Sequence, residues 1–188
     1  EQMQIAQSLL AAAGFERYEV ASYAKPGFAC RHNIAYWTGV PYLGIGTSAA
    51  TMTQNSERRM RMTDGSVTDD LNAEQMVAED LMLGMRTTHG ISEKEYHRIY
   101  RSDWEPIEET FELFERKGWA ERDGERWHLT PAGFLISNVL INAVLEAQTG
   151  AKVENNPWMR DAFRQEKKQE LPQGEYERFT SVYKDKLN

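Results

Sequence analysis

The sequence changes pattern repeatedly between residues 71 and 149, and this succession constrains the fold more than any other feature. Apolar residues fall at helical spacing in three stretches, two strand-like runs then flank Asp123-Gly124, and a last helical stretch follows. Helix-starting signals, either capping side chains or a first-turn proline, stand at Asn72, Ser92, Pro106 and Thr130. Helices followed by a hairpin and one more helix predict a winged-helix-like domain.

The N-terminal region follows a different pattern. Apolar residues at helical spacing lead to Gly14, and residues 15–23 then alternate as in a strand before a turn at Pro26-Gly27. Helix, glycine and strand form half of a repeating βα unit, so we expect a preceding part that this chain lacks. Residues 42–46 predict a short buried strand that enters a glycine-containing loop.

Two polar segments suggest where domains end. Residues 56–70 contain the turn signal Asp64-Gly65, which predicts a hairpin or a linker. The chain becomes polar again at residue 150, and we expect 150–188 to form a peripheral tail.

Composition excludes several classes of function. The single cysteine, Cys30, rules out an intrachain disulfide framework and cannot supply the set of thiolates that an iron–sulfur cluster needs. The net charge is −7, and residues 71–149 hold 15 acidic against 8 basic side chains, a balance that repels nucleic acid. No apolar run approaches the roughly 18 residues that cross a bilayer, and the chain opens without a basic leader. We therefore expect a cytoplasmic protein with no transmembrane segment and no nucleic-acid partner.

The densest group of chemically useful side chains lies near the N-terminus. His32 can ligate a metal such as haem iron, and Tyr36 and Trp37 offer flat apolar faces to a planar ligand. The alternative is structural: His32 hydrogen-bonds the backbone at a turn, and both rings pack in a core. Gly44 and Gly46 either let the backbone approach a ligand or only permit a tight strand exit.

Several stretches together resemble one protein family. The strings YEVASYAKPG, CRHNIAYW and YLGIGTSAA are similar to the end of the radical S-adenosylmethionine (SAM) barrel in the HemN/HemW group; they occupy residues 18–27, 30–37 and 42–50. Residues 78–92 and 115–140 resemble the C-terminal domain of that group. The HNxxYW string is more similar to HemW-like haem chaperones than to oxygen-independent coproporphyrinogen III oxidases.

The resemblance implies an α+β fold in two parts. Residues 1–55 would be the C-terminal piece of a radical SAM partial βα-barrel, and residues 71–149 the helical, winged-helix-like HemN C-terminal domain. Full-length members bind a [4Fe–4S] cluster and SAM through a CxxxCxxC loop, which this sequence does not contain. The expected protein is thus a fragment that lacks the N-terminal radical SAM portion, has no catalytic residues and performs no radical chemistry.

The resemblance also implies a ligand and a task. The histidine of HNxxYW is associated with haem binding, which carries over to His32 as a ligand of haem iron, with Asn33, Tyr36 and Trp37 completing the haem-binding site. The expected function is to bind haem or porphyrin and to deliver haem to a recipient apoprotein.

The glycine loop matches its family pattern only in part. Gly44 and Gly46 correspond to the first two glycines of GIGxGAHS, which implies a SAM or substrate loop. Ser48 and Ala50 stand where the pattern has its third glycine and its histidine.

Two other functions stay open. One is an oxygen-independent coproporphyrinogen III oxidase of porphyrin biosynthesis, an oxidoreductase in its full-length form. The other is a winged-helix regulator, whose recognition helix would span about residues 108–117. Four glutamates in that helix oppose only Arg116 and Lys117, which is the wrong charge for phosphate contact.

Overall fold

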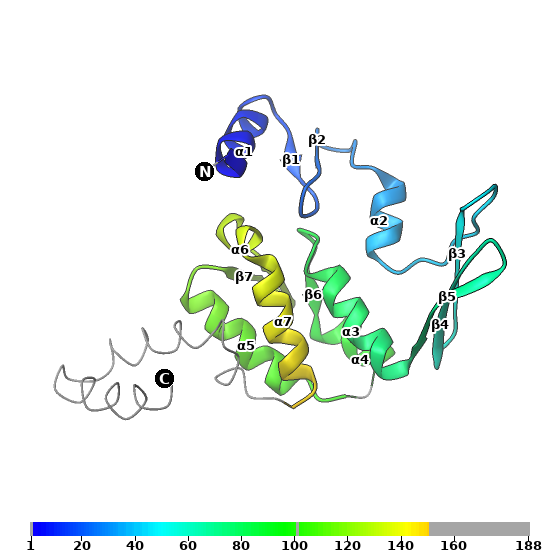
Figure 1. Ribbon diagram of the computed structural model, residues 1–188. Helices are drawn as coiled ribbons and strands as arrows, with labels where there is room; N and C mark the ends of the chain where they lie inside the picture. The colour runs from blue at the N-terminus through cyan, green and yellow to red at the C-terminus, as the bar shows by residue number, and fades with distance from the viewer. Residues whose placement is uncertain (1, 101, 151–188) are drawn as a thin grey trace, which may run out of the picture.

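The computed structural model describes residues 2–100 and 102–150 (Figure 1). The expected polar tail lies outside this part from residue 151 onward. Helices and strands are interspersed along the chain. Their bounds are α1 Gln2–Ala12, β1 Glu16–Arg17, β2 Tyr23–Ala24, α2 Arg31–Trp37, β3 Ala50–Gln54, β4 Arg58–Thr63, β5 Ser66–Asn72, α3 Ala73–Gly84, β6 Ile91–Ser92, α4 Glu93–Ile99, α5 Glu105–Arg116, β7 Ala120–Asp123, β8 Arg126–Leu129, α6 Pro131–Leu135 and α7 Ser137–Gln148.

The main hydrophobic core lies among α3, α5, α7 and the sheet formed by β6, β7 and β8. Helix α7 packs against both α3 and α5. The rings of Phe111 and Trp127 stack at 5.5 Å with an angle of 16° between their planes. Several core side chains are almost completely buried: Ile107, Phe111, Leu113, Phe114, Leu140 and Val144. Burial of this apolar surface is the main stabilising term for this region.

Capping side chains begin the helices where the sequence predicts. Asn72 accepts a hydrogen bond from the Gln75 backbone at 3.0 Å, and the Gln75 side chain reciprocates. Ser92 caps α4, and Thr130 caps α6 through the Gly133 backbone. These bonds satisfy backbone N–H groups that a first helical turn leaves without a partner.

The small sheet has the strand order β6-β8-β7, with both neighbouring pairs antiparallel. Strands β7 and β8 form the predicted hairpin, and Gly124 in its turn has a φ of 59°. The single helix predicted after Thr130 is wrong, because α6 and α7 are separated at Ile136. Gly133 of α6 lies against the Trp119 carbonyl, whereas α7 packs on α3 and α5, so the chain changes direction between them.

The strand predicted over residues 15–23 folds back on itself instead. Strands β1 and β2 pair antiparallel, with Arg17 opposite Tyr23. The Arg17 guanidinium donates to the Val20 carbonyl at 2.8 Å and to the Tyr23 hydroxyl. The alternating pattern of residues 15–23 therefore belongs to the two arms of a tight hairpin, which Arg17 stabilises.

A second antiparallel sheet has the order β3-β4-β5. Asp64 and Gly65 form the turn between β4 and β5, with φ values of 49° and 78°. Both values lie in the left-handed region that such a two-residue turn requires. This sheet lies at the far end of the molecule from α1 (Figure 1).

The short buried strand predicted at residues 42–46 is wrong. Only Tyr42 pairs, through two backbone hydrogen bonds with Met52, while the side chains of Leu43 and Ile45 are 76% and 87% exposed. The Gly44 N–H donates to the Thr51 hydroxyl at 3.0 Å, which turns the segment back towards β3. The result is an exposed loop closed at its base.

Within residues 2–100 and 102–150, no helix combines the length and the apolar character needed to cross a membrane.

Candidate functional site

Helix α2 presents the four predicted haem-binding residues on two different faces. Residues four apart share a face, because a helix advances by 3.6 residues per turn. His32 and Tyr36 therefore point one way and are exposed, while Asn33 and Trp37 lie about a quarter turn around and are half-buried. His32 and Tyr36 share the outward face, and the Tyr36 ring also meets the Trp37 ring edge-on, with ring centres 5.7 Å apart.

The inward face of α2 anchors the helix. The Asn33 side-chain amide donates a hydrogen bond to the Tyr18 hydroxyl at 3.4 Å. The Arg86 guanidinium lies 5.9 Å from the centre of the Trp37 ring and also reaches Asn138 at 3.4 Å. Asn33 and Trp37 thus hold α2 against the hairpin β1-β2 and the end of α3.

The outward face carries an aromatic step beside His32. The rings of Tyr36 and Tyr42 stack with centres 6.0 Å apart and 30° between their planes. Tyr36 is 45% exposed, and the His32 imidazole makes no hydrogen bond or ion pair with any residue that the structure describes. His32 thus makes no hydrogen bond to the described backbone, whereas the Tyr36 ring packs against the rings of Trp37 and Tyr42.

Sequence reasoning missed Tyr42 as a partner of Tyr36. It placed Tyr42 in a buried strand, where its ring would face a core. The two rings meet because the backbone bridge between Tyr42 and Met52, with N···O distances of 3.1 and 2.9 Å, brings the loop back beside α2. No local pattern signals a contact of this kind.

The loop glycines have structural roles. Gly44 lies so close to the Ala50 carbonyl that an added Cβ would stand 2.3 Å from its oxygen. Gly46 has a φ of 103° and open space around it. Close backbone packing accounts for Gly44, and an unusual backbone angle accounts for Gly46.

Changing Gly44 to alanine should lower the free energy of unfolding by about 1–3 kcal/mol, because the loop and β3 must move apart to admit the methyl group. Urea unfolding measures this loss. Leu43→Ala, at the exposed neighbouring position, is the matched control and should change little. Equal effects of the two changes would contradict the close approach.

A buried arginine fixes the segment that follows α2. The Arg59 side chain is 2% exposed, and its Nη1 lies 2.6 Å from Glu79 and 2.8 Å from Asp80 on α3. Its Nε donates to Gln54 at 2.8 Å, and the Gln54 amide donates to the Gly39 carbonyl at 2.9 Å. This chain of bonds joins α3, the second sheet and the end of α2.

Electrostatics in this network keep Glu79 charged and Tyr100 neutral. Burial raises the pKa of Glu79, but hydrogen bonds from Arg61 and Arg59 outweigh burial, so the net pKa is lowered. Burial and a hydrogen bond to Asp80 both raise the pKa of Tyr100. Glu79 is therefore ionised and Tyr100 is neutral at pH 7.

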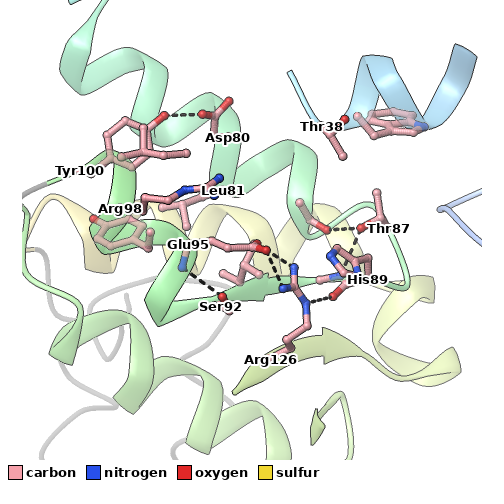
Figure 2. Close-up of a pocket in the computed structure, with 16 residues that line it drawn as sticks. Thr38, Asp80, Leu81, Thr87, His89, Ser92, Glu95, Arg98, Tyr100 and Arg126 are labelled. Atoms are coloured by element: carbon pink, nitrogen blue, oxygen red, sulfur yellow. Dashed lines mark hydrogen bonds and ion pairs between the residues drawn. The ribbon is translucent and has the colours of Figure 1, made fainter. Parts of the chain in front are cut away.

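A cleft of about 270 Å³ opens beside this network, and we call it the α3–α4 cleft (Figure 2). Its walls come from the end of α2, from α3 and α4, and from the loop before β6. Apolar side chains form much of its lining, namely Trp37, Leu81, Ile91, Tyr96, Ile99 and Tyr100. Its volume lies just below the range of about 300–1,000 Å³ that is typical of small-molecule pockets.

Polar groups stand at the mouth of the α3–α4 cleft. The Arg126 guanidinium binds both carboxylate oxygens of Glu95 at 2.9 and 2.8 Å and donates to the His89 carbonyl at 2.9 Å. Burial and the nearby Arg126 charge lower the pKa of His89, which leaves its imidazole neutral at pH 7. Sequence analysis did not single out His89, because an isolated histidine before a glycine carries no distinctive signal.

The described part of the chain contains no group of side chains that forms a candidate metal site. No three His, Cys, Asp or Glu side chains gather there as metal ligands. The whole sequence has one cysteine, so its residues do not fit a [4Fe–4S] cluster.

Comparison with known proteins gives a consistent result. Residues 71–136 match the HemN C-terminal domain family. The haem chaperone HemW of Synechocystis sp. is 28% identical over 173 residues, covering 75% of this chain and 42% of that protein. HemW of Bacillus subtilis is 26% identical over 162 residues, with coverages of 77% and 42%. HemW of Escherichia coli is 54% identical over 41 residues, which are 22% of this chain and 11% of that protein.

Among solved structures, the coproporphyrinogen III oxidase (HemN) of Escherichia coli, described as a radical SAM enzyme, aligns with a TM-score of 0.47 and 13% identity. The alignment covers 78% of this chain and 39% of that one. The chain spans about two fifths of the length of the Synechocystis and Bacillus relatives. Residues 71–136 thus carry a HemN C-terminal domain match, and the chain as a whole is similar to the C-terminal part of HemW proteins.

Proposed function

We propose that this chain is part of a HemW-like protein that binds haem and delivers it to an apoprotein. The observation that carries the proposal is an exposed imidazole without a partner, His32, one helical turn from the stacked rings of Tyr36 and Tyr42. The similarity to HemW haem chaperones supports the same reading.

The geometry suggests how the site would work. The His32 imidazole would donate a nitrogen lone pair to haem iron, and the flat rings of Tyr36 and Tyr42 would offer apolar contact to the macrocycle. Because these side chains are exposed, much of the haem stays accessible. An accessible haem suits transfer, since a recipient protein can contact it before His32 dissociates from the iron.

The proposed transfer of haem does not use the [4Fe–4S] cluster or SAM. In a full-length parent they would be held by the radical SAM portion, and SAM chemistry would belong to that portion. The residues of this chain would bind, orient and release haem. We place the protein in the cytoplasm, where a recipient haem apoprotein would be its partner.

We further propose that residues 71–149 form a winged-helix-like unit used for protein contact. The order α3-β6-α4-α5-β7-β8 and the sheet order β6-β8-β7 support this reading. Helix α5 buries its apolar side and leaves Glu109 and Glu112 exposed, and a shallow acidic hollow lies beside it. This charge argues against nucleic acid and favours a basic protein partner.

Haemin titration followed by Soret absorbance tests the proposed function. We expect saturable binding by the 188-residue chain, and at least about tenfold weaker binding at the α2 site in His32→Ala, or about 1.4 kcal/mol. His97→Ala is the matched control, because His97 is also exposed but lies 3.7 Å from the carboxylate of Glu93. Unchanged haemin binding by His32→Ala would remove His32 from the site.

A further inference from the structure

The four histidines of the chain fall into two pairs. His97 lies 3.7 Å from Glu93, and His128 lies 3.7 Å from Glu121. The imidazoles of His32 and His89 make no hydrogen bond or ion pair with the residues that the structure describes. These two imidazoles therefore keep both ring nitrogens available to an external ligand.

His32 and His89 lie on different surfaces of the protein. His32 stands on the outward face of α2, whereas His89 lies at the α3–α4 cleft, which the inward residue Trp37 also lines. Figure 2 shows His89 and Thr87 at one end of the cleft and Arg98 and Tyr100 at the other. His32 itself is not part of the cleft lining.

The cleft combines an apolar interior with balanced charges. Its floor includes the buried side chains of Leu81 and Ile91. The Asp80 carboxylate is paired with Arg59, and Glu95 is paired with Arg126. Apart from Arg98, the charged side chains of this lining are thus neutralised by their partners.

Size limits what the cleft can hold. An apolar cavity of about 150 Å³ accommodates one benzene molecule. At about 270 Å³ the cleft takes more than one such ring but does not enclose a whole porphyrin. The cleft therefore has room for only part of a macrocycle, and His89 is an exposed residue of its lining.

We propose that the α3–α4 cleft is a second haem-binding site, in which one edge of the macrocycle enters beside Trp37 and His89 ligates the iron. This inference rests on the proposed function, namely that the chain handles haem. The exposed Arg98 guanidinium lines the same cleft and is placed to bind a haem propionate by a charge-assisted hydrogen bond. The chain then holds haem at two positions, one on each side of α2.

The stoichiometry of haemin binding tests this proposal. The 188-residue chain is titrated with haemin, and Soret absorbance and electron paramagnetic resonance report the amount bound and the nitrogen ligation of ferric iron. We expect two haems per chain, one in His89→Ala, one in His32→Ala and two in His97→Ala. Thr38→Trp, which narrows the cleft without removing His89, should also reduce the number to one.

The outcomes separate this inference from the proposed function. One haem per chain, lost in His32→Ala and unaffected by His89→Ala, overturns the second site and leaves the proposed function standing. One haem that is lost only in His89→Ala supports the cleft and removes His32 from haem binding. No saturable binding by the unmodified chain overturns both.

Discussion

Replacing Arg59 with methionine lowers the free energy of unfolding by about 3 kcal/mol. The guanidinium is almost fully buried and neutralises Glu79 and Asp80, whose side chains are 16% and 27% exposed. Removing one partner of a buried ion pair typically costs about 3–5 kcal/mol because the remaining charge is left without compensation. The partial exposure of both carboxylates places the expected loss at the lower end.

Urea unfolding of Arg59→Met measures this effect, and the neighbouring Arg58→Met is its matched control. Arg58 pairs with Asp70, but those side chains are 56% and 46% exposed, so water screens the pair. We expect the unfolding curve of Arg58→Met to stay close to that of the unmodified chain. Similar losses in the two variants would show that Arg59 does not hold the sheet to α3.

Acid should reveal the same network. The pKa of Glu79 is lowered in the folded chain from its ordinary value of 4.5, so its stabilising contribution is complete above that value and is lost as the pH falls through the lowered pKa. Arg59→Met removes one cause of the lowering. Its stability should therefore fall less steeply than that of the unmodified chain below about pH 4.5.

Replacing Glu108 with alanine lowers the free energy of unfolding by about 2–4 kcal/mol. One carboxylate oxygen accepts hydrogen bonds from the indole N–H groups of Trp104 and Trp127, both at 2.8 Å, and the other accepts from Arg122 at 2.7 Å. The two tryptophan side chains are 4% and 2% exposed, so water cannot replace the lost acceptor. Each buried donor left without a partner costs about 1–3 kcal/mol.

Two variants make the Glu108 experiment specific. Glu108→Gln keeps an acceptor oxygen for the indoles and should lose less stability than Glu108→Ala. Glu109→Ala changes the adjacent exposed carboxylate and should have a small effect. Thermal or urea unfolding compares the stability of all three variants. If Glu109→Ala loses as much stability as Glu108→Ala, the hydrogen bonds from the two indoles to Glu108 do not explain the loss.

The sequence predicts those parts of the fold that local chemistry controls. The caps at Asn72, Ser92 and Thr130 and the hairpin turn at Asp123-Gly124 are where the patterns indicate, because each depends on residues within a few positions. The break at Ile136 does not follow from local spacing, since both sides carry apolar residues suited to one helix. It depends on which neighbours α6 and α7 pack against.

Some features of the candidate site also follow from local sequence, and others depend on the fold. His32 and Tyr36 are four residues apart in a helix, so a helical assignment alone would have put them on one face. The Tyr36–Tyr42 stack and the position of His89 depend on contacts between distant segments, which sequence spacing does not encode. The buried Arg59 is equally hidden, because in sequence it is one of three similar arginines in β4 and only the fold distinguishes it.

The two faces of α2 also separate what this helix must keep from what it is free to change. Asn33 and Trp37 contact other segments, so substitutions there disturb how the helix is anchored. The exposed His32 side chain contacts no other described segment through a hydrogen bond or ion pair, and its exchange should cost little stability. The chemistry at position 32 can therefore change while the anchoring of the helix stays intact.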